Sequence, residues 1–483
     1  MGLRKNALGL AAASATEYGL QLAIPMVLVR TLDPSTFGHY KFLWLMAGTA
    51  LAWVPLFMPQ ALFYFLPRYK KQSSEVVTNA LVYMLVTGAL VALLCSELNP
   101  FLPGIAQRLD VETRHLSSLF LGLMLVVCLF DVLPTAVGMS HVQARTTAVL
   151  ALVKSTLLVA AALLRPDLVW LALALVVVAT FKLIALLVFI QRDPELAPMR
   201  FNLSLLRMQL AYAAPFAFGN ALFLMRSQGD QWIVASSVDT ATYAVFSVAS
   251  VLGPIGTLIR QPLYSAMMPK LNAAFASARL EDVATLIGKV NGATSLILIP
   301  VIGGLFAISH ELVSFVYTPA YADAAPVMQI YLIGMLANSF AAGHVLPALN
   351  LGKFATINNA VCLLGSLAIS YLCLKHMGLF GASLGSVLML YVGELWSGIR
   401  VARVLGVGWQ RLMQASSLYR SFAALILSVI ATFISGHFGA WSLPMTISIK
   451  SVVFSFVYIS AFMLLGGLSD LKSVWGKQYQ IAP

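Results

Sequence analysis

The sequence predicts an all-α polytopic membrane protein of about 14 transmembrane helices, built as two pseudo-symmetric six-helix bundles plus two C-terminal helices. Fourteen apolar stretches of about 20 residues, parted by short polar or Pro- and Gly-marked breaks, fill almost the whole chain. A helix needs roughly 20 apolar residues to cross about 30 Å of hydrocarbon. With 60% hydrophobic residues, 10% charged residues and a mean hydropathy of +0.88, too little polar sequence remains for a soluble domain.

Each apolar stretch predicts one membrane-spanning helix. The expected spans are 7–31, 40–60, 77–97, 116–140, 146–164, 168–190, 210–233, 240–266, 289–308, 326–349, 355–375, 380–401, 418–437 and 447–467. The connections between them are short, about 25 residues at most. Functional groups should therefore lie between helices, because exposed loops do not occur within the hydrocarbon region.

An internal repeat predicts two halves of six helices each. The segment "TFGHY" ends at Tyr40 and "TATY" ends at Tyr243, while Pro67 and Pro269 are each followed by a basic residue at a matching offset. Six helices separate the matched elements, so the halves enter the membrane in the same orientation, with a cleft between two lobes. We expect an N-lobe at 1–200, a C-lobe at 201–405, and helices 13 and 14 with a cytoplasmic tail at 406–483.

Basic residues predict the orientation. Of the 30 Lys and Arg residues, 19 fall in loops on the side of the N-terminus and 6 on the other. Cytoplasmic loops retain positive charge, so both termini should be cytoplasmic. The net charge of +12 reflects this bias and needs no nucleic-acid partner, since basic loops also lie well on anionic membrane lipid.

Charged side chains inside the predicted spans are the candidate functional groups, because each costs about 2.5–3.5 kcal/mol or more unless it faces water or a partner. We expect an anionic substrate to be bound by Arg226, Arg260, Lys154, Lys182, Arg30 and Gln261. A coupling proton or Na⁺ is expected at Glu17, Asp131, Glu394 or Asp230. Ser14, Glu17 and Gln21 share one helical face, which predicts a polar stripe facing a lumen.

Structural interpretations of the same residues stay open. Arg30, Arg260 and Asp230 lie near enough to an interface to snorkel. Arg226 and Asp230 are four residues apart and could pair with each other. Lys154 and Lys182 could instead join helices through ion pairs with Glu17, Asp131 or Glu394.

The order of motifs along the chain resembles that of the polysaccharide (O-antigen and exopolysaccharide repeat-unit) flippases of the multidrug/oligosaccharidyl-lipid/polysaccharide exporter superfamily. "VLVRTLDPSTFGHYKFL" is similar to their first-hairpin signature, with Asp33 where the family usually has Gly. "APFAFGNALFLMRSQGDQWIV", "MMPKLNAAFA", "HELVSFVYTPAYADAAPVMQIYLIG", "NLGKFATINN" and "HMGLFGASLGSVL" resemble later segments of the family in the same order.

This resemblance implies a bacterial inner-membrane flippase that works by alternating access. Its substrate would be an undecaprenyl-pyrophosphate-linked oligosaccharide repeat unit, moved from the cytoplasmic to the periplasmic leaflet with H⁺ or Na⁺ coupling. A polysaccharide polymerase and glycosyltransferases are the protein partners it implies. The sequence contains no phosphate-binding loop of the G-x-x-x-x-G-K-[ST] type, no metal-ligand spacing and no nucleophile with a base. We therefore expect a transporter that is not an enzyme and uses no cofactor and no metal.

Three alternatives compete with this interpretation. A lipid II flippase also has fourteen helices and a cationic cavity, but the first hairpin fits the exopolysaccharide branch better. A multidrug/cation antiporter of the same superfamily has twelve helices and a more acidic cavity. A membrane scaffold of a polysaccharide assembly complex belongs to another class, and transport-dead variants that still assemble the complex would distinguish it.

Overall fold

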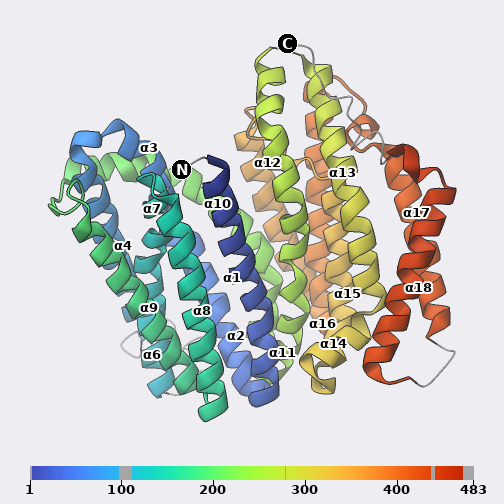
Figure 1. Cartoon of the computed structure of the whole chain (residues 1–483), viewed down its shortest axis with the longest axis horizontal. Helices are drawn as coiled ribbons and strands as arrows, with labels where there is room; N and C mark the ends of the chain where they lie inside the picture. The colour runs from blue at the N-terminus through green and yellow to red at the C-terminus, as the bar shows by residue number, and fades with distance from the viewer. Residues whose placement is uncertain (1–2, 97–110, 278, 437–440, 471–483) are drawn as a thin grey trace. The chain divides into compact units, whose positions relative to one another are not determined.

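The computed structural model describes residues 3–96, 111–277, 279–436 and 441–470 (Figure 1). These residues form helices and connecting turns, without a strand among them. Twelve of the described helices are long and apolar enough to cross a membrane. One of the twelve folds back on itself and so makes two passes. A further span, which is interrupted, lies before it. The described chain therefore accommodates the fourteen expected passes. The predicted all-α polytopic membrane fold is confirmed.

The chain divides into two compact units. Unit 1 comprises Met1–Gln228 with Val238–Ala244, and unit 2 comprises Gly229–Ser237 with Val245–Pro483. The lobe boundaries expected from the sequence at 200 and 405 remain a prediction. Each unit is described by itself below.

Unit 1 holds the first six passes and most of the seventh. Its elements are α1 (Leu3–Thr31), α2 (Pro34–Trp53), α3 (Met58–Arg68), η1 (Lys70–Gln72), α4 (Ser73–Cys95), α6 (Val111–Val127), η2 (Cys128–Asp131), α7 (Leu133–Ala136), α8 (Ser140–Leu164), α9 (Leu168–Arg192), most of α10 (Leu203–Ser237) and the start of α11 (Thr240–Ala249). Buried side chains of α3, α4, η2 and α9 form an apolar core around Met58, Leu62 and Leu129.

The second pass begins six residues earlier than expected. The Asp33 carboxylate accepts a hydrogen bond from the Thr36 N–H at 3.0 Å, and Pro34 occupies the first helical turn. An aspartate cap followed by proline is a favoured helix start, which explains the early beginning. Gly38, a residue of the first-hairpin motif, lies against the Thr240 carbonyl, where an added Cβ would come within 2.1 Å. Only glycine fits this close approach of α2 and the start of α11.

Two passes of unit 1 are interrupted. Between α2 and α3 the chain makes a turn in which Leu56 and Phe57 have positive φ angles of 45° and 62°. Between α6 and α7, the 3-10 turn η2 replaces regular helix just before Pro134. Such strained or irregular backbone in a span persists only where the surrounding structure holds it. The continuous helices expected at 40–60 and 116–140 are therefore broken in the structure.

Unit 2 contains the remaining elements. They are η3 (Ser250–Leu252), α12 (Pro254–Ala276), α13 (Leu280–Ala307), α14 (Ser309–Tyr317), η4 (Pro319–Tyr321), α15 (Ala324–Met335), η5 (Leu336–Ser339), η6 (Gly343–Val345), α16 (Gly352–Leu405), η7 (Trp409–Leu412), α17 (Ala415–Ser435) and α18 (Leu443–Leu464). Its two interruptions, at 250–253 and 336–351, fall in the expected eighth and tenth passes. The interrupted passes of unit 1 are the second and fourth, so the breaks recur at an interval of six passes.

The long helix α16 is two antiparallel passes joined at Gly378, whose φ of 61° and ψ of −149° are not helical. The Ser370 hydroxyl donates to the Ala382 carbonyl at 2.7 Å, and the Asn358 amide donates to the Gly393 carbonyl and the Ser397 hydroxyl at 3.1 and 3.0 Å. In each pair one residue precedes Gly378 and the other follows it. The helices expected at 355–375 and 380–401 are thus the two arms of a hairpin.

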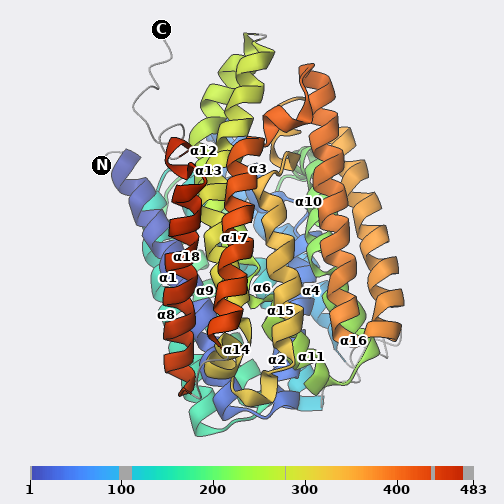
Figure 2. The same ribbon diagram turned by 90° about the vertical axis from the view of Figure 1, so that its right-hand side faces the viewer.

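The two C-terminal helices pack on α13 within unit 2. Figure 2 shows α17 and α18 side by side. Gly303 of α13 permits their close approach, since an added Cβ would come within 2.9 Å of Leu425 and Phe454. Lys450 of α18 forms an ion pair with Glu311 of α14, and Arg420 of α17 pairs with Asp470 at 3.0 Å. The first pair joins α18 to α14, and the second joins α17 to the segment that follows α18.

Candidate functional site

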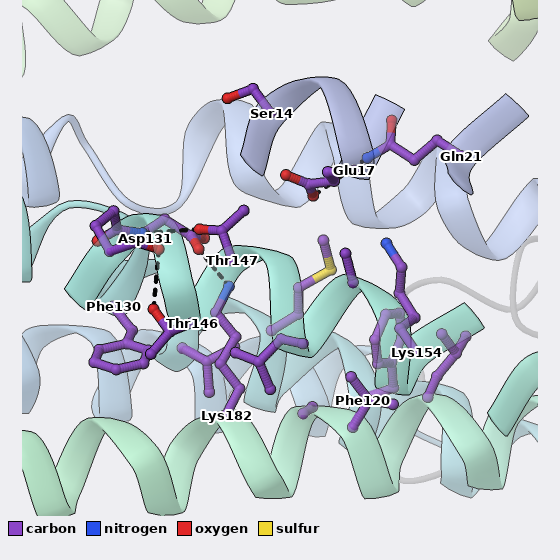
Figure 3. A pocket seen from close by; sticks show the side chains of 18 of the residues that line it. Ser14, Glu17, Gln21, Phe120, Phe130, Asp131, Thr146, Thr147, Lys154 and Lys182 are labelled. Atoms are coloured by element: carbon purple, nitrogen blue, oxygen red, sulfur yellow. Dashed lines mark hydrogen bonds and ion pairs between the residues drawn. The ribbon is translucent and has the colours of Figure 1, made fainter. Parts of the chain in front are cut away.

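A polar stripe on α1 forms one wall of a cavity within unit 1. Ser14, Glu17 and Gln21 all line this cavity, which has a volume of about 500 Å³ (Figure 3). The Gln21 amide donates to the Glu17 carboxylate at 3.3 Å. The spacing of three and four residues that predicted a shared helical face therefore directs these side chains into one space.

The opposite wall carries an ion pair between two helical elements. Asp131 ends the irregular turn η2, and Lys182 lies near the middle of α9. The Lys182 Nζ is 2.6 Å from the Asp131 Oδ1, and the Asp131 side chain keeps 53% of its surface exposed. The break in the fourth pass thus places a carboxylate beside a cation in the cavity wall.

Lys154 of α8 is the second cation of this cavity. Its Nζ lies 5.5 Å from the centre of the Trp44 ring, close enough for a cation–π interaction. Figure 3 shows the amino group pointing toward the helix that carries Glu17 and Gln21. The structure therefore brings Glu17, Asp131, Lys154 and Lys182 together at one cavity from four separate elements.

A smaller cavity of about 230 Å³ adjoins the first and contains a cation that sequence reasoning missed. The two cavities share Gln21, Trp44 and Lys154, and the smaller adds Tyr40 and Lys41. Lys41 lies at the very start of the span expected at 40–60, so it was counted among the six basic residues on the side opposite the N-terminus and not among the embedded cations. The Asp33-Pro34 helix start is the sequence feature that could have placed Lys41 correctly, because it puts Lys41 in the third turn of α2.

Three other predicted substrate ligands do not line these cavities. Arg30 is exposed at the end of α1, where it donates to the Met26 carbonyl. Arg226 is half-buried on α10, and Gln261 is exposed on α12. Their roles in substrate binding remain predictions.

Arg260 is the most deeply buried predicted cation, with 2% of its surface exposed. Its guanidinium donates to the Asn291 side chain at 3.0 Å, to the Ala341 carbonyl at 2.6 Å and to the Asn338 carbonyl. Asn291 in turn donates to the Leu412 carbonyl at 2.8 Å. In this conformation the guanidinium bonds to backbone carbonyls of the interrupted tenth pass. A role for Arg260 in anion binding remains a prediction.

Glu394 and Asp230 also have partners within unit 2. The Glu394 carboxylate accepts from the backbone N–H groups of Ala342 and Gly343 at 3.1 and 3.2 Å. Asp230, 2% exposed, accepts from the Tyr331 hydroxyl at 2.7 Å and from the Gln231 N–H at 2.8 Å. Both carboxylates satisfy donors of neighbouring elements, and a coupling role for either remains a prediction.

A multi-pass helical protein with recurring broken passes and a charged cavity between helices has the architecture of a membrane transporter. The sequence model of the family described as polysaccharide biosynthesis proteins matches residues 27–326. The chain belongs to this family. The match confirms the resemblance on which the sequence argument relied. A search of curated protein sequences gives no match.

Solved structures share the fold. The lipid II flippase MurJ in an inward closed conformation superposes with a TM-score of 0.67 at 9% identity, covering 96% of this chain and 99% of that one. An inward-facing multidrug resistance MATE family transporter of the MOP superfamily gives 0.63 at 15% identity, covering 80% and 95%. A MOP superfamily transporter from Pyrococcus furiosus, described by the reverse polarity of its binding pocket, gives 0.54 at 15% identity, covering 83% and 96%. At these identities the likeness shows the fold alone, which this chain shares with these transporters.

Proposed function

We propose that the protein is a flippase for lipid-linked oligosaccharides, and that the cavity of unit 1 binds an anionic part of its substrate. The observation that supports this most is the meeting of Lys154 and Lys182 at one cavity inside a membrane-spanning bundle. A charge at membrane depth is costly, so cations that line a wet cavity there point to a bound anion. The substrate that fits the family is an undecaprenyl-pyrophosphate-linked oligosaccharide repeat unit.

The direction and location of transport follow from the same proposal. The excess of basic residues in loops on the N-terminal side supports cytoplasmic termini in a bacterial inner membrane. Repeat units of lipopolysaccharide or exopolysaccharide would then move from the cytoplasmic to the periplasmic leaflet by alternating access. Glycosyltransferases that assemble the unit and a polymerase that consumes it are the proposed partners.

For ion coupling we propose Glu17 rather than Asp131. Asp131 already has a cationic partner at 2.6 Å, so its charge is compensated in the resting cavity. Glu17 is half-buried on the facing helix, where the Gln21 amide is a neutral partner. A carboxylate bonded to a neutral group in a cavity is the better candidate for proton or Na⁺ exchange.

The test is export of polymer in cells that carry single substitutions. Lys154→Ala should reduce export about 10- to 100-fold, because a charge-assisted hydrogen bond contributes about 1.5–3 kcal/mol. Lys71→Ala is the matched control, because Lys71 is an exposed lysine of η1 in the same unit and lies outside both cavities. Full export by Lys154→Ala and Lys182→Ala, at normal protein levels, would rule out the cavity as the substrate site.

Glu17→Gln tests the coupling role separately. Purified protein in proteoliposomes should lose transport driven by an imposed pH or Na⁺ gradient, while it still binds substrate. A stable Glu17→Gln protein whose transport still follows the gradient would exclude this residue as the coupling site.

The whole-length match to the lipid II flippase fold makes a lipid II substrate the second candidate. The same proteoliposomes distinguish it, because a repeat-unit flippase should move its own lipid-linked oligosaccharide and leave lipid II in place. An antiporter would instead move cationic drugs. A scaffold would support polymer assembly even when Lys154 is replaced.

A further inference from the structure

We propose that the end of the unit 1 cavity formed by Lys41, Trp44 and Lys154 is a subsite for one sugar ring that carries a carboxylate. This inference rests on the proposed function and names the kind of sugar that the flippase selects. Gln21, Trp44 and Lys154 line both cavities, so the larger and the smaller space adjoin at these residues. The smaller space, which contains Lys41, is the part that sequence reasoning did not foresee.

The charges around the joined cavities leave one positive charge to be matched. Three ammonium groups, those of Lys41, Lys154 and Lys182, face two carboxylates, those of Glu17 and Asp131. Lys182 and Asp131 neutralise each other at 2.6 Å. A ligand with one negative charge, bound near Lys41 and Lys154, would therefore neutralise the net charge of the joined cavities. Buried charges need such a partner.

The walls of this end suit a sugar ring better than a phosphate. Trp44 supplies aromatic surface, which can cover the apolar C–H face of a ring, and the buried Tyr40 ring packs against it at 6.4 Å between centroids. The Gln21 amide, which lines both cavities, is a donor for ring hydroxyl groups. A carboxylate on the same ring would bind between the two ammonium groups.

Size and cation type argue against the pyrophosphate as the occupant. The smaller cavity of about 230 Å³ lies below the roughly 300–1,000 Å³ of pockets for drug-sized ligands, so it admits about one ring. A pyrophosphate diester carries two negative charges, and the joined cavities leave only one unmatched positive charge. Both cations at this end are lysines, which bind carboxylate and phosphate alike as point charges, so they supply none of the bidentate geometry by which arginine favours phosphate.

The test compares three small probes on the purified full-length protein in lipid nanodiscs. Methyl β-glucuronide and methyl β-glucoside differ in the carboxylate, and inorganic pyrophosphate represents the other anion. Ligand-observed NMR titration should give at least about tenfold tighter binding of the glucuronide, since one charge-assisted hydrogen bond contributes at least about the 1.4 kcal/mol of a tenfold ratio. Lys41→Met should bring the glucuronide down to the affinity of the glucoside.

Two further variants make the result decisive. Lys41→Arg keeps the charge and should retain most of the preference, and Lys71→Met, outside the cavities, should retain all of it. Equal affinity of the two glycosides for the wild-type protein would overturn the subsite, and this comparison needs no variant to fold. Displacement of the glucuronide by pyrophosphate at lower concentration would overturn it in favour of a pyrophosphate site.

Export measurements separate the two proposals. If Lys154→Ala abolishes export while the wild-type protein does not prefer the glucuronide, the subsite is wrong and the flippase proposal stands. If export survives all substitutions at the cavity, the flippase proposal fails at this site, whatever the glycosides do.

Discussion

Unit 1 and unit 2 each contain a cluster of charged side chains at membrane depth, and the two clusters are built in opposite ways. In unit 1, Lys154 and Glu17 line an open cavity, and among the described residues neither has an oppositely charged group within ion-pair distance. In unit 2, Arg260 and Glu394 are bonded to backbone carbonyl and N–H groups of the interrupted tenth pass. An embedded charge can therefore serve a ligand or replace missing helix hydrogen bonds, and only its neighbours distinguish these roles.

The interrupted tenth pass explains why unit 2 needs the charges of Arg260 and Glu394. Residues 336–345 leave carbonyl and N–H groups without helical partners, and in hydrocarbon each unsatisfied group costs several kcal/mol. The guanidinium of Arg260 satisfies two carbonyls, and the carboxylate of Glu394 satisfies two N–H groups. The interruption in unit 1 at η2 instead presents the Asp131 carboxylate to the cavity.

The largest expected effect is therefore on stability, in unit 2. Arg260→Ala should destabilise the protein by about 3 kcal/mol or more, because it leaves buried carbonyls and the Asn291 side chain unsatisfied. The melting temperature of the detergent-purified protein would fall by several degrees. Lys154→Ala is the comparison, and it should change this temperature little. An Arg260→Ala protein that melts normally but does not transport would support the anion-binding role predicted from the sequence.

A smaller effect is expected from the ion pair of Lys182 and Asp131 in the wall of the unit 1 cavity. Lys182→Met and Asp131→Asn should each destabilise the protein by about 1 kcal/mol, because the pair is partly exposed and screened. A double-mutant cycle of melting temperatures measures the coupling between the two side chains. Coupling of several kcal/mol would mean that this pair, like the unit 2 cluster, chiefly supports the fold.

The smallest effect concerns the helix caps outside the membrane spans. Hydrogen bonds from the Thr242 hydroxyl and N–H lower the pKa of Asp239, which caps α11. At Asp33, burial raises the pKa, but hydrogen bonds from Thr36 and Ser35 outweigh it and leave the pKa lowered. A lowered carboxyl pKa stabilises the fold above the ordinary value of about 3.9 and loses this contribution as the pH falls below it.

Asp239→Ala should therefore lower the melting temperature slightly at pH 7, by the loss typical of a helix cap, and have less effect near pH 3. Asp239→Asn is the control, since asparagine also caps helices. An effect of Asp239→Ala that grows as the pH falls would contradict the assigned sign.

The sequence predicted the class of fold because hydrophobic length alone determines where a chain can cross a membrane. It also singled out Glu17, Asp131, Lys154 and Lys182, which line one cavity, because charges in apolar stretches are conspicuous, and their roles remain predictions. It could not predict the interruptions at 54–57 and 336–351, because they depend on partners distant in sequence, such as Arg260 for residues 338–341. Lys41 was missed because the expected second span began six residues late, which put Lys41 at the membrane interface instead of in the wall of a cavity.

The central claim is that the unit 1 cavity serves the substrate and the unit 2 cluster serves the fold. The most direct measurement is flux of the lipid-linked oligosaccharide in proteoliposomes, normalised to folded protein, for the wild type, Lys154→Ala and Arg260→Lys. We expect Lys154→Ala to fold normally and lose about 90% of the flux or more. Arg260→Lys should yield less folded protein, but that protein should transport at close to the wild-type rate. Normal flux in Lys154→Ala, together with fully folded but inactive Arg260→Lys, would contradict the account.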